Sequence, residues 1–201
     1  MSTEITVQAI CKIEDVMKKI EDIGYVLTET LIGSDSYFSL ISKEEIENAS
    51  YSQLLNSSLI IRAFKMVQKN IEKVELLHKS KVLDEDGNVI SEKKSSVSIE
   101  NKDKAKEVLS MTGMINWIDF NQKNHFYKKD DITIIVGEVE GLEGTFIEIE
   151  SYKSIENETP ENQFEILKKL VDSLGFETTG DYSCKKCYML YQKNMFCKNH
   201  C

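Results

Sequence analysis

The sequence predicts an α+β fold in which eight antiparallel strands form a closed or nearly closed β-barrel, with helices packed on the outside. Three observations predict it. Short segments alternate apolar and polar residues with period two, and amphipathic helical segments lie between them. A third is that the polar faces of the strands carry mixed charge. About eight strands closing on themselves would enclose a polar lumen wide enough for one small ligand.

The clearest strand is predicted at residues 146–150, after a glycine-broken turn. Its alternation directs Phe146, Glu148 and Glu150 to one face and Ile147 and Ile149 to the other. A solvated surface strand would show the same pattern. A functional interpretation therefore needs other strands with charged faces.

Other strands do carry such charges. The polar face of residues 4–9 begins with Glu4, and residues 94–100 begin with Lys94. Residues 58–65 place Arg62 in an otherwise apolar strand, where an unpaired guanidinium would be costly. Arg62 therefore needs an anion or water, and a structural ion pair with Glu75 or Glu100 is the alternative to a binding role.

Residues 73–81 form a further candidate strand with Lys79 and Lys81 on one side, although a lysine-rich strand end is usually solvated. The remaining strand candidates are residues 25–30, 35–41, 116–121, 125–128, 132–137 and 182–191. Residues 43–56 and 83–92 are predicted connections, the first with room for a short helix and the second with a turn at 84–88.

Three amphipathic helices are predicted at residues 13–24, 103–113 and 160–175. Gly24 suits the end of the first, and Pro160 and Gly175 suit the two ends of the third. Their apolar stripes would cover the apolar face of the sheet while the polar face curls inward.

Composition limits the alternatives. The chain has 201 residues, and no apolar run approaches the roughly 20 residues of a membrane span. A net charge of −9 argues against a broad nucleic-acid-binding surface. Without a charged-then-apolar leader at the start, a cytoplasmic protein is expected. We expect one domain over residues 1–192 and a cysteine-containing tail over 193–201.

The C-terminal cysteines raise the question of a zinc site, because thiolates and a histidine can bind zinc tetrahedrally. The candidate ligands are Cys184, Cys187, Cys197 and Cys201, with His200 beside them. A strand over 182–191 would direct Cys184 and Cys187 to opposite faces. Reduced thiols without metal are therefore the favoured interpretation.

Taken together, these motifs resemble the CYTH superfamily, which contains class IV adenylyl cyclases, thiamine triphosphatases and related inorganic triphosphatases. The resemblance spans nearly the whole chain to about Tyr191 and is strongest over residues 136–150. Arg62 is similar to the arginine of the family's leucine-arginine strand motif, and residues 76–79 resemble the segment that contains a phosphate-binding lysine. Residues 186–188 resemble the lysine-serine-tyrosine sequence at which the family's barrel closes.

The resemblance implies a triphosphate tunnel. Its phosphate-binding residues would be Arg62, Lys79, Lys81, Lys94 and Lys186. Its carboxylates, which would hold Mg²⁺ or Mn²⁺, would be Glu4, Glu148 and Glu150. The chain departs from the family pattern at several places, because Thr6 and Gln8 replace the second acid and the lysine of the N-terminal motif, and Asn124 and Gly137 replace an arginine and an aspartate.

The implied activity is that of a class IV adenylyl cyclase, which converts ATP to cyclic AMP and pyrophosphate. An inorganic or thiamine triphosphatase is a second interpretation, and a non-catalytic protein that binds a nucleotide or polyphosphate is a third. The expected partner is a nucleoside triphosphate or other polyphosphate, with no nucleic acid and no membrane. No catalytic residue is assigned, and the oligomeric state stays open, with a homodimer as one option.

Overall fold

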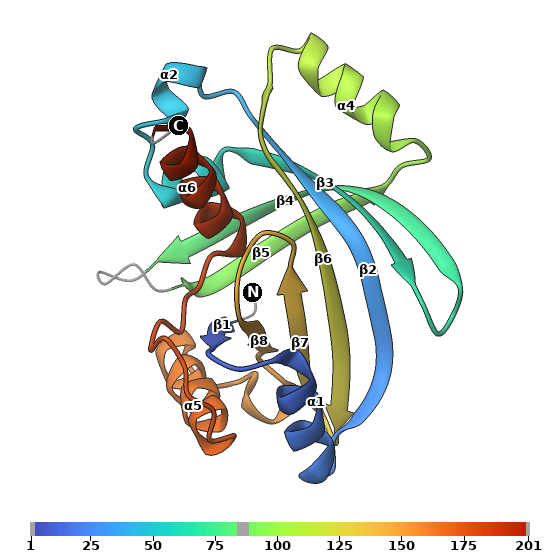
Figure 1. Ribbon diagram of the computed structural model, residues 1–201, viewed down its shortest axis with the longest axis vertical. Helices are drawn as coiled ribbons and strands as arrows, with labels where there is room; N and C mark the ends of the chain where they lie inside the picture. The colour runs from blue at the N-terminus through green and yellow to red at the C-terminus, as the bar shows by residue number, and fades with distance from the viewer. Residues whose placement is uncertain (1–2, 84–88, 200–201) are drawn as a thin grey trace.

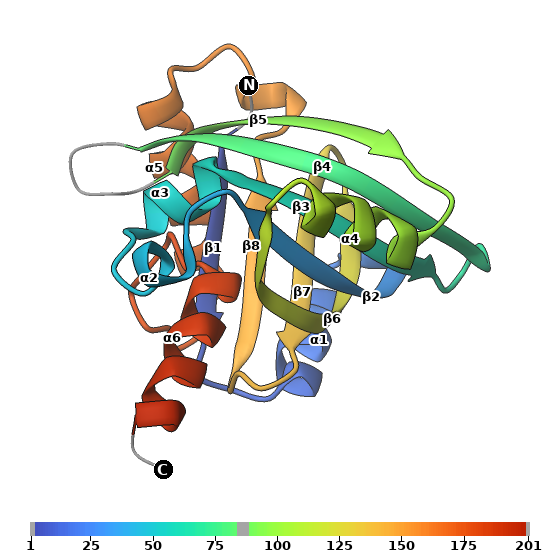
Figure 2. The same ribbon diagram turned by 90° about the horizontal axis from the view of Figure 1, so that it is seen from above.

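A single antiparallel sheet carries the fold of the computed structural model, which describes residues 3–83 and 89–199. Its strand order is β1-β8-β7-β6-β2-β3-β4-β5, and the sheet curls around an interior (Figures 1 and 2). The strands are β1 Glu4–Ala9, β2 Val26–Ser39, β3 Ser58–Met66, β4 Ile71–Leu83, β5 Val89–Ser98, β6 Ile115–Lys129, β7 Ile132–Val139 and β8 Thr145–Glu150.

The barrel is nearly closed. Within the described ranges no ladder joins the edge strands β1 and β5. Residues 177–184 cover part of the free edge of β1, where Thr6 N donates to Tyr182 O at 3.1 Å and Cys184 N donates to Thr6 O at 2.9 Å. Covering an edge removes a template for pairing with another chain. The predicted α+β fold with a nearly closed eight-stranded barrel is confirmed.

The helices lie outside the curled sheet, as predicted (Figure 2). The chain forms α1 Ile13–Asp22, α2 Lys43–Ile46, α3 Tyr51–Asn56, α4 Lys102–Met111, α5 Pro160–Ser173, α6 Lys186–Asn199 and the 3₁₀ helix η1 Lys153–Ile155. The predicted ends of the helices are also found: Gly24 follows α1 with a φ of +93°, and Pro160 occupies the first turn of α5. None of these helices is long and apolar enough to cross a membrane.

The outer face of the sheet packs against α1 and α5. Ile147 and Ile149 of β8 are fully buried there, together with Ile20 of α1 and Leu167 of α5. Complete burial of each such side chain stabilises the fold by about 1.5–3 kcal/mol relative to exposure. Because strand side chains alternate, this outward packing fixes Glu148 on the inner face.

Two strands each join two segments that the sequence predicts as separate strands. β2 joins the separate segments 25–30 and 35–41, and β6 joins 116–121 and 125–128. The apolar alternation breaks at Gly33, but the strand continues through this residue. A Cβ atom at Gly33 would lie 2.3 Å from Ala63 O. Only glycine permits this close pairing of β2 with β3. β5 likewise starts at Val89, inside the predicted connection 83–92, while the turn at 84–88 lies outside the described residues.

The strand predicted over 182–191 is wrong, because helix α6 begins at Lys186. Cys187, Leu190 and Tyr191 follow the spacing of a helical face, and they pack on a cluster that includes Trp117. The burial of this face favours helix over strand. The predicted domain boundary at residues 192/193 falls within α6.

Candidate functional site

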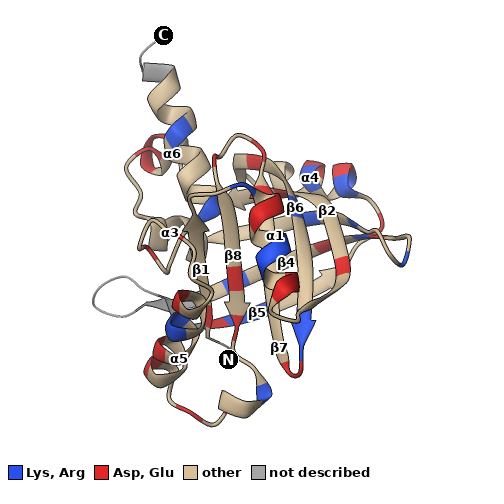
Figure 3. Cartoon of the chain, turned by 60° about the horizontal axis from the view of Figure 1, so that its bottom comes forward, with Lys and Arg blue, Asp and Glu red and all other residues tan. Residues whose placement is uncertain are grey.

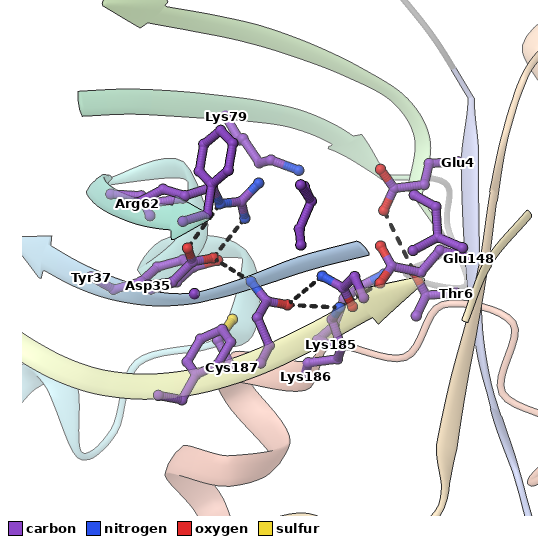
Figure 4. A pocket seen from close by; sticks show the side chains of 18 of the residues that line it. Glu4, Thr6, Asp35, Tyr37, Arg62, Lys79, Glu148, Lys185, Lys186 and Cys187 are labelled. Carbon is purple, nitrogen blue, oxygen red and sulfur yellow. Dashed lines mark hydrogen bonds and ion pairs between the residues drawn. The ribbon is translucent and has the colours of Figure 1, made fainter. Parts of the chain in front are cut away.

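The interior of the curled sheet contains a cavity of about 350 Å³. Its acidic lining residues are Glu4, Asp35, Glu75, Glu92, Glu148 and Glu150. Its basic lining residues are Arg62, Lys79, Lys94, Lys185 and Lys186. Figure 4 shows Arg62 and Lys79 on one side of the pocket and Glu4, Thr6 and Glu148 on the other. Six carboxylates and five cations therefore share one enclosed space.

Arg62 makes a two-point ion pair with Asp35. Arg62 Nε donates to Asp35 Oδ1 at 2.8 Å, and Nη2 donates to Oδ2 at 2.6 Å. The Asp35 side chain is only 1% exposed, against 26% for Arg62. Burial alone would lower the pKa of Arg62, but the Asp35 carboxylate outweighs it and raises that pKa, so Arg62 stays charged. The alternative to a binding role was an ion pair of Arg62 with Glu75 or Glu100, and the partner in the structure is Asp35 instead.

Lys79 and Lys186 also have carboxylate partners inside the pocket. Lys79 Nζ lies 2.8 Å from Glu92 Oε1. Burial would lower the pKa of Lys79, but Glu4 and Glu92 outweigh this effect and raise it. Lys186, in the first turn of α6, pairs with Glu148 Oε1 and also donates to Gln122 Oε1 at 3.2 Å.

The pairing with Lys186 sets the charge state of Glu148. Burial would raise the pKa of Glu148, but Lys186, followed by Lys79 and Arg62, outweighs burial and lowers it. Glu148 is therefore an ionised carboxylate whose charge is already matched by a cation. This pairing joins a predicted metal ligand to a predicted phosphate ligand.

Glu4 and Glu150 form a different arrangement. They are direct partners across β1 and β8, and both line the pocket. Burial and the neighbouring Glu4 carboxylate raise the pKa of Glu150, because two like charges disfavour ionisation. A divalent cation between them would relieve this repulsion. The donor chemistry of Glu4 and Glu150 thus fits Mg²⁺ or Mn²⁺, while Glu148 does not fit as long as it pairs with Lys186.

The described ranges contain no group of three or more histidine, cysteine, aspartate or glutamate side chains that could hold a metal ion without further ligands. Magnesium commonly takes one or two protein carboxylates and completes its shell with water and substrate phosphates. A pair of carboxylates is thus compatible with a metal that arrives together with a phosphate ligand.

The other predicted basic residues are placed less centrally. Lys94 is on β5, where it is exposed to solvent yet borders the pocket. Lys81 lies on β4, but its side chain is outside the described part of the structure. The structure therefore brings Arg62, Lys79 and Lys186 together.

The residues at the departures from the family pattern have local partners. Thr6 Oγ1 donates to Glu4 Oε1 at 3.4 Å within the pocket, whereas Gln8 Nε2 donates to Glu143 O at 2.7 Å in the β7–β8 turn. Asn124 lines the pocket opposite Gly137, and its Nδ2 donates to Gln122 Oε1 at 3.1 Å. Polar groups that pair with neighbouring protein atoms replace the expected charges.

Sequence reasoning missed several members of the site, among them Asp35, Glu92 and Gln122. Gln122 Nε2 donates to Asp35 Oδ2 at 3.1 Å, so it links the Arg62 and Lys186 pairs. The alternation of 33–37 could have placed Asp35 on the polar face of its strand. Glu92 was assigned to a connection, so its orientation had no basis in the sequence.

The cysteines of the C-terminal segment lie in different environments. Cys184 and Cys187 are buried and line the pocket, Cys197 is exposed, and Cys201 is outside the described residues. Burial and the nearby Asp181 raise the pKa of Cys184 to about 11, which favours its neutral thiol. The argument that Cys184 and Cys187 point to opposite faces of a strand no longer applies, because Cys187 lies on α6.

Acidic and basic residues are interspersed along α1, α4 and α5 in Figure 3, and the formal net charge is −9. The strongest concentration of opposite charges described above is in the interior.

No protein-family model and no curated protein matches the sequence. Among solved structures, the PH1819 protein of Pyrococcus horikoshii is 26% identical, with a TM-score of 0.68 over 89% of this chain and 92% of that one. A candidate adenylate cyclase from Vibrio parahaemolyticus is 14% identical, with a TM-score of 0.62 over 95% and 97% of the two chains.

A third similar structure is HpAC1 from Hippeastrum, a candidate adenylyl cyclase described as having a dominant triphosphatase activity. It is 15% identical, with a TM-score of 0.59 over 96% of each chain. Such similarities extend over nearly all of the chain and agree with the eight-stranded curled sheet and its outer helices. The chain therefore shares the fold of these structures, which agrees with the resemblance of its motifs to the CYTH superfamily.

Proposed function

We propose that the protein binds a triphosphate in the interior pocket together with a divalent metal, and that its reaction is that of a class IV adenylyl cyclase, which converts ATP to cyclic AMP and pyrophosphate. The observation that carries this proposal is the convergence of three partly buried cations from β3, β4 and α6 on one cavity, whose lining also includes Glu4 and Glu150. Phosphoryl transfer depends mainly on positioning and electrostatic stabilisation of this kind.

The cations have donors left for phosphate oxygens. An arginine has five N–H donors, and Asp35 takes two of those of Arg62. Lys79 and Lys186 each have three donors, one of which contacts a carboxylate. Each cation can therefore hold a phosphate while its carboxylate partner fixes its position.

The charge balance of the pocket supports metal dependence. Six acidic and five basic side chains line it, so the protein alone does not neutralise a triphosphate. Bound Mg²⁺ or Mn²⁺ would offset the charge of the phosphate oxygens. Glu4 and Glu150 would hold the metal, and the bound cation would favour the ionised form of Glu150.

Two other functions remain distinct candidates. A triphosphatase would use the same pocket with water rather than a ribose hydroxyl as the nucleophile, and the activity described for HpAC1 favours this alternative. A non-catalytic binding protein is favoured by Thr6 and Gln8, which supply neither the second carboxylate nor the lysine of the family motif.

Product analysis distinguishes these functions. The purified protein is incubated with ATP, thiamine triphosphate or tripolyphosphate and with Mg²⁺ or Mn²⁺, and the products are separated by chromatography. Cyclic AMP with pyrophosphate supports the cyclase, and orthophosphate supports the triphosphatase. Calorimetric binding without product supports the binding protein, and absence of binding to all three compounds refutes the proposal.

Two variants show whether the pocket is responsible. Arg62→Met should abolish binding or activity, because it removes a partly buried cation from the lining of the cavity. Lys104→Met is the matched control, since Lys104 forms an exposed pair with Glu107 on α4.

A further inference from the structure

Four large apolar side chains line the pocket without joining a hydrophobic core. They are Leu31, Phe64, Phe126 and Ile135, and we call them the apolar lining. None of them belongs to a core cluster in the described part of the chain. Each is only partly buried, whereas the next residue after Ile135, Val136, faces outward and is fully buried. The interior of the barrel thus presents apolar surface that the protein itself does not cover.

Strand register brings these four residues together. Phe126 of β6 pairs directly with Ile135 of β7, and Leu31 of β2 lies opposite Asn124, two residues before Phe126. Phe64 of β3 pairs with Gly33, which lies two residues after Leu31. A side chain at Gly33 would come within 2.8 Å of Phe64 Cβ, so glycine lets Phe64 lie close to β2.

The apolar lining adjoins the cationic part of the pocket. Phe64 follows Arg62 by two residues on the same face of β3, a separation of about 7 Å along the strand. On β2 the inner face runs from Asp35 through Gly33 to Leu31. A ligand held by Arg62 through its phosphates can therefore extend onto the apolar lining.

The chemistry of the apolar lining discriminates among triphosphates. Tripolyphosphate consists only of phosphate groups and would leave these side chains in contact with water. A nucleoside triphosphate carries a planar base whose face stacks on aromatic rings, largely independently of base identity. Only the second kind of ligand matches both parts of the cavity.

We infer that the apolar lining is the base-binding subsite of the pocket, with Phe64 and Phe126 as its aromatic contacts, and that the ligand class is nucleoside triphosphates rather than inorganic polyphosphates. This inference rests on the proposed function, because it requires phosphates at Arg62, Lys79 and Lys186. It adds the residues that select the non-phosphate part of the ligand.

Calorimetry with two probes tests the inference. The probes are α,β-methylene-ATP, whose bridge resists loss of pyrophosphate, and tripolyphosphate, each with Mg²⁺. The wild-type protein should bind the nucleotide at least about fivefold more tightly than tripolyphosphate, and Phe64→Ala and Phe126→Ala should each weaken nucleotide binding by roughly 5- to 150-fold. Tripolyphosphate binding should stay within about twofold of wild type.

Controls separate loss of stacking from loss of folding. Phe196→Ala removes a phenylalanine that is 71% exposed on α6 and should change neither affinity. Phe64→Leu and Phe126→Leu keep apolar volume without an aromatic face. They should weaken nucleotide binding and leave tripolyphosphate binding unchanged.

The outcomes have different meanings for the two proposals. Equal affinity of the wild-type protein for both probes, or equal weakening of both by the phenylalanine variants, overturns the base-binding subsite and leaves the proposed function intact. Failure of the wild-type protein to bind either probe overturns the proposed function as well.

Discussion

The ion pair between Arg62 and Asp35 provides the sharpest test of the interior electrostatics. Arg62→Met leaves the Asp35 carboxylate, 1% exposed, with Gln122 as its remaining hydrogen-bond partner among those described at the site. Removing one partner of a buried pair costs about 3–5 kcal/mol, because an uncompensated charge stays behind. We expect a loss in this range for Arg62→Met.

The reverse substitution should cost less. Asp35→Asn leaves the charge on Arg62, whose side chain is 26% exposed and can be partly hydrated. We expect a loss of about 2–3 kcal/mol, toward or below the lower end for a buried pair. For a chain of 201 residues, 1 kcal/mol lowers Tm by about 2–4 °C. The expected decreases are about 6–20 °C for Arg62→Met and about 4–12 °C for Asp35→Asn.

The double variant separates this pair from unrelated effects. Because it leaves neither charge unpaired, its loss should be smaller than the sum of the two single losses by about 2–3 kcal/mol. Urea unfolding followed by circular dichroism measures all three values. Additive losses below about 1 kcal/mol each would show that water screens the pair and that the interior is open. Lys104→Met, which breaks an exposed pair, should cost less than about 1 kcal/mol.

Three further predictions concern separate parts of the structure. Lys186→Met should destabilise the protein at pH 7, since it removes the cation that lowers the pKa of Glu148. The difference in stability from wild type should shrink as the pH falls through the pKa of Glu148. A difference that stays constant when unfolding is measured against pH would contradict this. Glu150→Gln should raise Tm at pH 7, because a carboxyl with a raised pKa destabilises the fold where it is ionised. The same substitution should remove stabilisation by Mg²⁺. A lower Tm in thermal scans would refute the repulsion between Glu150 and Glu4. Gly33→Ala should lower the free energy of unfolding by about 3 kcal/mol or more, because its Cβ would lie 2.3 Å from Ala63 O. Gly180→Ala, with a φ of +76° and open space around it, should lower that energy by about 1–2 kcal/mol. Equal losses in urea unfolding would refute the clash.

Local patterns predicted the strands whose outer faces are buried by helices. The predicted strand at 146–150 corresponds to β8 because Ile147 and Ile149 pack outward, and their alternation with the glutamates is visible in the sequence. The strand at residues 4–9 was predicted for the same reason. Periodicity works where one face of a strand is buried by apolar packing.

The pairing of charges could not be predicted in the same way. The sequence predicts that Arg62 needs an anion, but it does not identify Asp35, which lies 27 residues away. Lys186 and Glu148 are 38 residues apart and were assigned to different ligands. Which acid meets which base depends on strand register and on the position of α6, and both arise from the tertiary structure.

The ion pairs of the pocket help to explain how the chain can lack two charged residues of the N-terminal family motif. The two replacements at Thr6 and Gln8 remove one acid and one base together, so they leave the net charge of the motif unchanged. Gln8 instead fixes the β7–β8 turn through Glu143 O, while Thr6 supports Glu4 within the pocket. A pocket with nearly balanced charge is stable without ligand, because each buried cation described above has a carboxylate partner. The same balance makes binding of a bare triphosphate unfavourable, so affinity should depend steeply on the divalent metal that accompanies it.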